Sequence, residues 1–519
     1  MDDEQREVVA FLRDPKSYSP GTGPVQVVET HASLVFLAGA YAYKLKRAVK
    51  YAYLDFSTLQ LRRAACTAEL KLNRRTAPSL YLEVRAISRA RDGRLRWGRE
   101  GRPDDAVIDY VVVMRRFEQR DLLDNLAQRG ALSAPLLHAL TRHIAEFHDK
   151  AEERLDRGGS AIMAGLVETN IGIVRRSRTA GFEPRQIDRI ETALGRELSR
   201  AGALLDSRRA AGKVRLCHGD LHLGNICVAD GRPLLFDCIE FSEDIASIDV
   251  LYDLAFLLMD LAHCGHRDFA NLVLNRYLDL TGEDARKDHG LAAMPLFLAL
   301  RALIRAHVTA TRAERSGGDE DRAAAFADAR AYLDDAETAL RPGAPLLVAI
   351  AGLSGTGKST LAARLAPDLG RMPGARWLRS DVTRKLLFGT DPETRLPQEA
   401  YAPAITDQVY RDLRAGAAAS LRAGYAAVID AVALREDERR AFTAVAVEAG
   451  VPFVGLWLEA PGDALMARVA ARRGDASDAS PAIVAQQLEH DPGLLDWRRI
   501  DASAGPDATL AAVRAALSL

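Results

Sequence analysis

The sequence has few cysteines, and no two of them stand at a metal-binding spacing. Its 519 residues include only five cysteines, an odd number, and no Cys-x-x-Cys motif. Cysteines in apolar surroundings without such a motif are typical of reduced thiols in the core of an intracellular protein. The sequence therefore gives no sign of a disulfide framework. The five residues are Cys66, Cys217, Cys227, Cys238 and Cys264.

Targeting and membrane-spanning signals are also absent. The N-terminal run MDDEQREVVAFLRD is acidic, whereas a signal peptide begins with basic residues and continues with an apolar run. No uninterrupted apolar stretch reaches about 18 residues, the length that would indicate a membrane span. We expect a cytoplasmic protein that does not bind membranes.

An excess of charge of one sign is lacking as well. The 70 lysines and arginines are balanced by 71 aspartates and glutamates, which leaves a formal net charge of -1. Such a chain has no overall basic field to attract nucleic acid. We therefore expect small-molecule partners rather than nucleic acid, and the composition leaves the oligomeric state open.

The length and one proline-rich break predict the domain organisation. A chain of 519 residues is too long for one hydrophobic core, so two or three domains are expected. The clearest break is the run Arg-Pro-Gly-Ala-Pro at residues 341–345, because its prolines and glycine cannot continue the preceding helix. The sequence therefore predicts one domain over residues 1–340 and a second over residues 346–519.

The hydrophobic periodicity differs between these segments. Residues 24–117 are rich in strand patterns and hold one helical segment, and the chain is mainly helical from there to residue 340. We expect a small lobe over about residues 1–117 and a helical lobe over about residues 118–340. Beyond residue 345, strand patterns alternate with helices, which is typical of a parallel sheet. The predicted fold class is an α+β bilobal domain followed by an α/β domain with a mainly parallel sheet.

A phosphate-binding loop follows the first strand pattern of the second domain. The run GLSGTGKST matches G-x-x-x-x-G-K-S/T, with an apolar strand before it and a helix after it. Its backbone N–H groups would cradle phosphates, while Lys358 reaches the β- and γ-phosphates and the Ser359 hydroxyl ligates Mg²⁺. The predicted nucleotide-binding residues are Gly352, Ser354, Gly355, Thr356, Gly357, Lys358, Ser359 and Thr360.

Two carboxylates and a basic segment follow this loop, and the whole segment resembles the P-loop kinases that include gluconate kinase, polynucleotide kinase, chloramphenicol phosphotransferase and zeta toxin. Asp381 stands in RSDVTRK, and Asp430 ends the buried pattern AAVID. The resemblance implies that Asp381 is the base on the acceptor hydroxyl, although a helix N-cap is the alternative. Asp430 is either a carboxylate on the Mg²⁺ side or a turn residue. The resemblance also implies a lid formed by Arg468, Arg472 and Arg473, whose alternative is a solvated helix face.

The first domain contains the spacing of a kinase catalytic loop. The run HGDLHLGN reads as H-G-D-x-x-x-x-N, and the next strand pattern, PLLF, delivers Asp237. In such a loop Asp220 would orient the substrate hydroxyl, while Asn225 and Asp237 would hold Mg²⁺. Three matched residues at this spacing are far more specific than one. His218 is expected to be structural, and His222, His263 and His266 lack metal-ligand spacing.

This region resembles the aminoglycoside phosphotransferase and choline-kinase-like branch of the protein-kinase fold over roughly residues 25–335. The resemblance implies that Lys44 holds the α- and β-phosphates of ATP, that Glu69 is its ion-pair partner, and that Met114 lies in the hinge beside adenine. It also implies that Asp253 braces the catalytic loop. Lys46 is a second candidate for the phosphates, because side chains alternate along a strand and it shares a face with Lys44.

One departure from the pattern of protein kinases leaves open which groups cover the phosphates. No G-x-G-x-x-G motif precedes Lys44, and the corresponding turn is residues 29–33, so backbone groups or Ser33 would have to cover the phosphates.

The acidic residues Glu243, Asp244 and Asp249 either line a cavity for a cationic substrate or form an exposed turn.

Together the motifs predict a bifunctional ATP-dependent phosphotransferase. Each domain would transfer the γ-phosphoryl group of ATP to a hydroxyl group of a small molecule, with Mg²⁺ at both sites. One alternative is a ligand-sensing pseudokinase module that regulates the P-loop kinase. The other is a P-loop domain that acts on nucleic-acid ends. The acceptor is not encoded in these motifs, because many substrates share the same phosphate chemistry.

Overall fold

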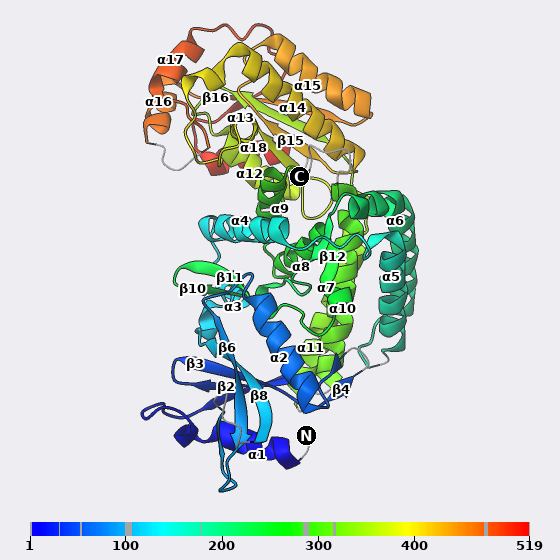
Figure 1. Cartoon of the computed structure of the whole chain (residues 1–519). Helices are drawn as coiled ribbons and strands as arrows, with labels where there is room; N and C mark the ends of the chain where they lie inside the picture. Colours follow the sequence, from blue (N-terminus) through cyan, green and yellow to red (C-terminus); the bar gives the residue numbers. More distant parts are fainter. Residues whose placement is uncertain are drawn as a thin grey trace. The chain divides into compact units, whose positions relative to one another are not determined.

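Figure 1 shows the chain, coloured along the sequence. Two compact units make up the chain, and neither is one continuous segment. The computed structural model describes residues 3–30, 32–51, 54–98, 106–177, 179–283, 290–314, 318–471 and 476–517. The first unit comprises Met1–Gly158 and Arg209–Leu257, and the second comprises Gly159–Arg208 and Leu258–Leu519. The break predicted at residues 341–345 lies inside the second unit, so the division of the chain there remains a prediction.

The first unit contains a six-stranded antiparallel sheet with two helices on opposite faces. The strand order is β1-β2-β3-β8-β6-β7. Alternation along β8 sends Val111 and Val113 toward helix α1, and Val112 and Met114 toward helix α2. The elements are α1 (Asp3–Arg13), β1 (Gln26–Glu29), β2 (Ser33–Ala38), β3 (Tyr41–Lys46), α2 (Leu59–Asn73), β6 (Tyr81–Arg89), β7 (Leu95–Trp97) and β8 (Ala106–Arg115).

Short strands and helices complete the first unit. Strands β10 and β11 form an antiparallel hairpin, β9 pairs with β12, and β4 pairs with β5. Helix α4 packs against β11. The elements are β4 (Lys50–Tyr51), β5 (Leu54–Asp55), α3 (Leu123–Gln128), α4 (Ala134–Lys150), β9 (Val214–Leu216), β10 (Ile226–Ala229), β11 (Arg232–Leu235), α7 (Glu243–Ala246), β12 (Ser247–Asp249) and α8 (Val250–His263), which continues into the second unit.

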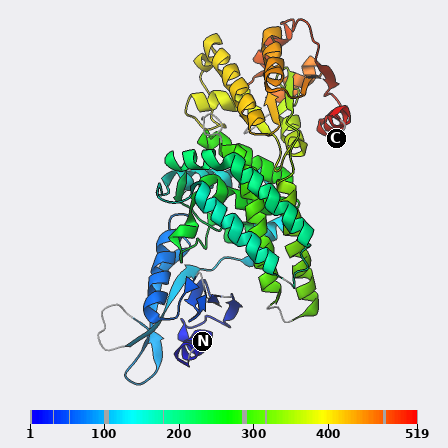
Figure 2. The ribbon, with the colours of Figure 1, turned by 90° about the vertical axis from the view of Figure 1, so that its right-hand side faces the viewer.

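Long helices form one part of the second unit. Helices α5, α10 and α11 lie side by side (Figures 1 and 2). Residues Gly290–Glu314, which include α10, are long and apolar enough to cross a membrane, but 72% of their most apolar window is buried inside the protein. This burial is typical of a core helix. The helices are α5 (Gly159–Arg176), α6 (Pro184–Ala210), α9 (Arg267–Thr281), α10 (Met294–Glu314) and α11 (Asp319–Ala339).

A five-stranded sheet forms the other part of the second unit. Its order is β14-β15-β13-β16-β17, and every pair of neighbours is parallel. Helices α14 and α15 cover one face, and α12 and α18 cover the other. The fold class predicted from sequence is confirmed: a kinase-like domain precedes a P-loop domain. The strands are β13 (Leu347–Gly352), β14 (Arg376–Arg379), β15 (Ala427–Asp430), β16 (Phe453–Glu459) and β17 (Arg498–Asp501).

The helices around this sheet follow its strands in the alternating order expected from the sequence. They are α12 (Lys358–Leu365), α13 (Ser380–Leu387), α14 (Pro403–Arg422), α15 (Glu436–Ala449), α16 (Gly462–Ala470), α17 (Pro481–Leu488) and α18 (Pro506–Leu517).

His263, at the end of α8, is expected to stabilise the protein in a pH-dependent way. The ring nitrogens of His263 lie 2.6 Å from Asp335 and 3.0 Å from Asp328, and the ring stacks on Tyr332. Burial alone would lower the pKa of His263, but the hydrogen bonds to both carboxylates raise it from 6.5 to about 9. This stabilisation is complete below the unfolded pKa and is lost as the pH rises through the folded pKa.

We therefore expect His263→Gln to lower the free energy of unfolding by about 2 kcal/mol at pH 6, and by much less at pH 10. Urea unfolding at the two pH values measures the difference, with the exposed His490→Gln as the control. Equal losses at both pH values would contradict the charged state of His263.

Candidate functional site

Two lysines of β3 share one buried glutamate. Lys44 and Lys46 point to the face of the sheet that α2 covers, and Glu69 on α2 is fully buried there. The distances from Glu69 to the lysine nitrogens are 2.8 Å for Lys44 and 2.5 Å for Lys46. Lys44 also pairs with Asp237, and Lys46 with Glu240. The structure thus brings together Lys44, Glu69 and Asp237 from three distant segments.

The electrostatics of this cluster favour charged side chains. Burial alone would raise the pKa of Glu69, but the two lysines lower it to about 2. Glu69 is therefore ionised at neutral pH and holds both ammonium groups. The Asp237 side chain is 41% exposed, so it is the member of the cluster that a ligand reaches most easily.

The catalytic-type loop runs between β9 and β10 and places its polar side chains together. The Asn225 amide donates to the Asp220 carboxylate at 2.9 Å and to the Asp220 backbone carbonyl at 3.0 Å. His222, expected from sequence to be an ordinary histidine, lies 3.4 Å from the Asp220 carboxylate. Asp237 adopts a left-handed conformation with φ of +62° and donates its N–H to the Tyr81 hydroxyl. This unusual backbone turn directs the Asp237 side chain to Lys44.

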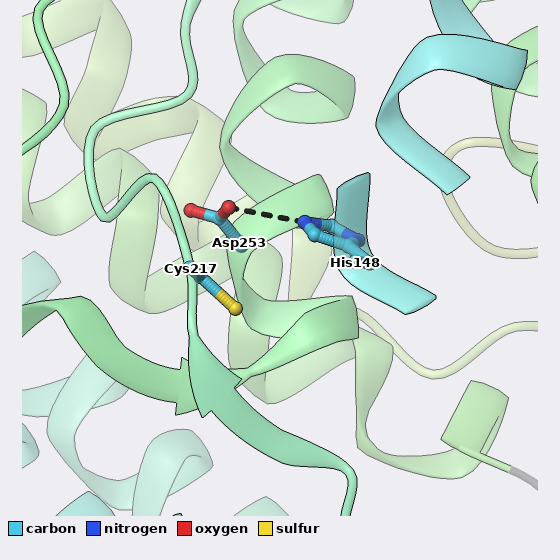
Figure 3. Close-up of side chains that lie close together, drawn as sticks. All are labelled: His148, Cys217 and Asp253. Atoms are coloured by element: carbon cyan, nitrogen blue, oxygen red, sulfur yellow. Dashed lines mark hydrogen bonds and ion pairs between the residues drawn. The ribbon is translucent and has the colours of Figure 1, made fainter. Parts of the chain in front are cut away.

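The buried carboxylate of Asp253 holds the backbone of the loop; Figure 3 shows it beside His148 and Cys217. Asp253 accepts hydrogen bonds from the N–H groups of His218 and Gly219 at 3.1 and 2.9 Å, and its carboxylate lies 3.1 Å from the His148 ring. His148, Cys217 and Asp253 lie close enough together to hold a metal ion. However, both oxygens of Asp253 accept from the backbone, and the Cys217 thiol donates to the Ile248 carbonyl. These hydrogen bonds explain why the three side chains lie together: they hold the backbone of the catalytic-type loop in place.

Two further residues considered for this site are buried in the first unit. Met114 is buried on β8 among apolar residues that include Ala42. Ser33 is also buried, and its backbone closes the β1–β2 turn with Thr30. His31, in the same turn, lies outside the described residues.

The phosphate-binding loop connects β13 to α12 in the conformation that its glycines allow. Gly352 has φ of +134°, and a Cβ atom there would lie 2.4 Å from the Leu458 carbonyl oxygen. Gly355 and Gly357 also have positive φ angles, of +92° and +91°. The Lys358 ammonium donates to the Leu353 carbonyl at 3.0 Å and so lies over the loop. The sequence motif therefore forms a loop whose backbone only glycine accommodates at these positions.

A hydroxyl and two carboxylates meet beside this loop. Ser359 donates to the Asp430 carboxylate at 2.6 Å, because β15 is the neighbour of β13 and ends at Asp430. This contact favours the Mg²⁺-side reading of Asp430 that the sequence left open, since a hydroxyl and a carboxylate are the oxygen ligands that Mg²⁺ prefers. Asp381, at the start of α13, lines one cavity together with Ser359 and Asp430. Burial raises the pKa of the Asp381 carboxyl, as does Asp430, whereas Arg379 opposes this.

Two cavities flank the loop. One, of about 390 Å³, is lined by Lys358, Ser359, Asp381, Arg384 and Asp430. The other, of about 310 Å³, is lined by Thr356, Thr360, Arg468, Gly505 and Thr509. Gly355 and Gly357 line both cavities, so each cavity lies against the phosphate-binding loop.

Arg468, expected to be part of a lid, lines the second cavity. Its guanidinium donates to the carbonyl of Ala502 at 3.0 Å and lies 3.5 Å from that of Gly355. Arg472 and Arg473 lie outside the described residues, so the lid remains a prediction.

Arg384 is a residue that the sequence analysis did not select. It is only 6% exposed, lines the cavity beside Asp381, and donates to the Ala400 carbonyl and the Thr406 hydroxyl. Within the part of the chain that the structure describes, no carboxylate forms an ion pair with it, and its Nε atom has no hydrogen-bond partner. A buried guanidinium in this state has unused capacity for an anion. The i+3 spacing from Asp381 was the only sequence signal available.

Comparisons with known proteins match two separate segments of the chain. The family model for the phosphotransferase enzyme family matches residues 56–291, and the one for an AAA domain matches residues 347–491. Relatives from Mycobacterium bovis and Mycobacterium tuberculosis are 29% identical over 493 residues, which is 93% of this chain and 93% of theirs. Those relatives are described only as uncharacterized proteins.

Solved kinase structures match parts of this chain at low sequence identity. A gluconokinase from Sinorhizobium meliloti is 20% identical over 34% of this chain and 93% of its own, with a TM-score of 0.25. A choline kinase from Cryptosporidium parvum is 10% identical over 64% of this chain and 95% of its own, with a TM-score of 0.39. Since the two family models match separate segments, this chain is a tandem protein in which an aminoglycoside-phosphotransferase-like domain precedes a P-loop kinase-like domain.

Proposed function

We propose that the chain is a bifunctional ATP-dependent phosphotransferase that acts in the cytoplasm, where ATP is available. Each site transfers the γ-phosphoryl group of ATP to a hydroxyl group of a small molecule. The observation that carries the proposal is that each unit brings a lysine close to carboxylates. Lys44 pairs with Glu69 and Asp237 in the first unit, and Lys358 lines one cavity with Asp381 and Asp430 in the second. Family membership of the two segments supports phosphotransferase activity in general, and the two-site assignment goes beyond it.

In the first unit, the residues divide into phosphate, metal and acceptor roles. Lys44 contacts the α- and β-phosphates and is held in place by Glu69. Asn225 and Asp237 offer the amide and carboxylate oxygens for Mg²⁺, which when bound neutralises the charge on the phosphates. Asp220 accepts the proton of the acceptor hydroxyl, and its hydrogen bond from Asn225 fixes its orientation.

In the second unit, the glycine loop and Lys358 bind the phosphates, and Ser359 with Asp430 offers the oxygen ligands for Mg²⁺. The adenine base occupies the cavity beside Arg468. Asp381 accepts the acceptor proton in the opposite cavity. Its burial supports this role. Burial raises the pKa of Asp381, and a general base is most effective when its pKa lies near the working pH.

The acceptor of the second site carries a negative charge in this proposal. Arg384 lines the acceptor cavity with a buried guanidinium that has no ion-pair partner among the described residues. A carboxylate or phosphate group on the substrate would complete its hydrogen bonding in a planar, directional manner. The proposed substrate is therefore an anionic small molecule with a free hydroxyl group.

The first prediction of this proposal separates the two sites. Asp220→Asn and Lys358→Ala should each remove a different part of ATP consumption, reducing their own component by about a hundredfold. The measurement is ATP consumption by the full chain with a cellular metabolite pool as acceptor. The double variant is the background. If Asp220→Asn has no effect, the first unit is a binding module, and if neither variant has an effect, both assignments are wrong.

A second prediction decides which lysine of β3 binds phosphate. Lys46→Met leaves Glu69 and Glu240, whose side chains are 0% and 7% exposed, without this partner, so it should destabilise the protein by about 3 kcal/mol. Lys44→Met leaves Glu69 paired with Lys46 and should instead abolish Mg²⁺-ATP binding at this site. Urea unfolding and calorimetric titration in the Lys358→Ala background measure the two effects.

The exposed Lys50→Met serves as the control for loss of a surface ion pair. A stable Lys46→Met protein that no longer binds Mg²⁺-ATP would assign the phosphate role to Lys46.

The third prediction concerns Arg384. Arg384→Met should raise the half-saturating concentration of acceptor by about tenfold or more while leaving Mg²⁺-ATP affinity unchanged. The acceptor is supplied as metabolite fractions separated by anion exchange, and the fraction retained on the column should support turnover. The exposed Arg422→Met is the control. Turnover with the neutral fraction that is insensitive to Arg384→Met would refute the anionic acceptor.

A further inference from the structure

The outer edge of β14 is covered by side chains of helix α9, which precedes it by about a hundred residues in the same compact unit. Strand β14 is at the end of the sheet order, so one of its edges has no neighbouring strand among the described residues. Arg376 donates its N–H inward to Ala426 on the β15 side. The N–H of Trp377 and the carbonyl of Ala375 therefore point outward, where an uncovered edge would leave them without strand partners.

Asn275 makes the hydrogen bonds that another strand would make. Its amide oxygen accepts from the Trp377 N–H at 2.7 Å, and its amide nitrogen donates to the Ala375 carbonyl at 3.1 Å. Asn271, one helical turn earlier, donates to the same carbonyl at 3.0 Å. Asn271 and Asn275 are 2% and 4% exposed. These buried amides satisfy a strand edge that water does not reach.

A third residue on the same face of α9 extends the contact to a buried arginine. Asp279 lies 2.5 Å from the Arg376 guanidinium, which also donates to the Asn275 amide oxygen at 3.0 Å. Arg376 is 3% exposed, and a guanidinium so buried requires partners of this kind. The spacing of Asn271, Asn275 and Asp279 at four-residue intervals places all three on one face of α9.

The strand held in this way delivers Asp381. Strand β14 ends at Arg379, and α13 begins at Ser380 without an intervening loop. The position of Asp381 is therefore set by β14, whose outer edge is set by α9. Beyond α13, Arg276 of α9 forms an ion pair with Glu393 at 3.2 Å. Helix α9 thus contacts the chain on both sides of α13.

We propose that Asn275 and Asp279 of α9 are positioning residues for the acceptor base of the P-loop site. The P-loop segment is then not a self-sufficient kinase, because the helix that completes its sheet lies in the preceding aminoglycoside-phosphotransferase-like segment. This inference rests on the proposed role of Asp381. Helix α9 acts on the acceptor side of the site, since the phosphate loop follows the central strand β13 and lies away from β14.

The test uses the full chain with the first site silenced by Lys44→Met. Asn275→Leu and Asp279→Asn should each lower acceptor-dependent ATP consumption by about tenfold, while the Kd for Mg²⁺-ATP at the P-loop stays within about twofold of the parent value. Asp268→Asn, the same chemical change at an exposed position of α9, should change neither quantity. A purely structural role would weaken ATP binding in parallel with turnover.

Three results would decide against the proposal or its basis. Unchanged turnover in the α9 variants overturns it, as does an equal loss of ATP affinity and turnover. If Asn275→Leu does not fold, Asp279→Asn, which keeps the side-chain shape, decides alone. Asp381→Asn is measured in the same background: if it leaves turnover intact, the proposed function of Asp381 is wrong whatever the α9 variants do.

Discussion

Glu69 lies between two lysines in the interior of the first unit, and the arrangement of the surrounding elements follows from that contact. A fully buried carboxylate is tolerated only when opposite charges or hydrogen bonds replace water. Strand β3 supplies both lysines because alternate side chains share a face, and α2 packs on that face. The lysines then hold Asp237 and Glu240, which come from the segment after β11. One buried charge thereby connects the sheet to the turn that carries the proposed metal ligand.

The same constraint distinguishes structural from functional charges in the second unit. Arg376 is buried with Asp279, and Lys385 is buried with Asp478 at 2.9 Å. Both cations are satisfied within the protein, so they carry no unused binding capacity. Arg384 is comparably buried and lines a cavity, yet among the described residues it only stacks on the Tyr401 ring and donates to neutral oxygen atoms, without an ion pair. This difference is why Arg384, and not Arg376 or Lys385, is assigned to the acceptor.

The sequence predicted the parts of both sites that depend on local spacing. Gly352 to Thr360 run from the end of β13 into the first turn of α12, and Asp220 to Asn225 lie on one short segment before β10. In both, backbone geometry fixes the residue types and their separation. Both loops have the local geometry that the spacing implies. The residue range of the strand-rich part and the parallel sheet also followed from periodicity. These features are readable because each is determined within about thirty residues.

Contacts between distant segments were not readable in the same way. Glu240 is 194 residues from Lys46, and nothing near it in sequence identifies its partner. The Ser359–Asp430 contact requires that β13 and β15 be neighbours, a fact about strand order that the alternation of helices and strands does not contain. His222 lies beside the Asp220 carboxylate, but its spacing in the sequence fits no metal site and so gives no sign of this contact. The roles of Met114, Arg468 and Arg472 remain predictions.

Helix α9 links the segment before residues 341–345 to the sheet that follows them. A run of prolines and glycine marks residues 341–345 as a break in regular structure, and a break in regular structure is often a boundary of cooperative folding. Here the hydrogen bonds of the β14 edge cross that break, because their partners lie on a helix that precedes it. Cutting the chain at residues 341–345 would expose Trp377 N–H and Ala375 C=O together with the Arg376 guanidinium. The P-loop sheet therefore depends on the segment before it, which gives a structural reason for the two kinase-like domains to share one polypeptide.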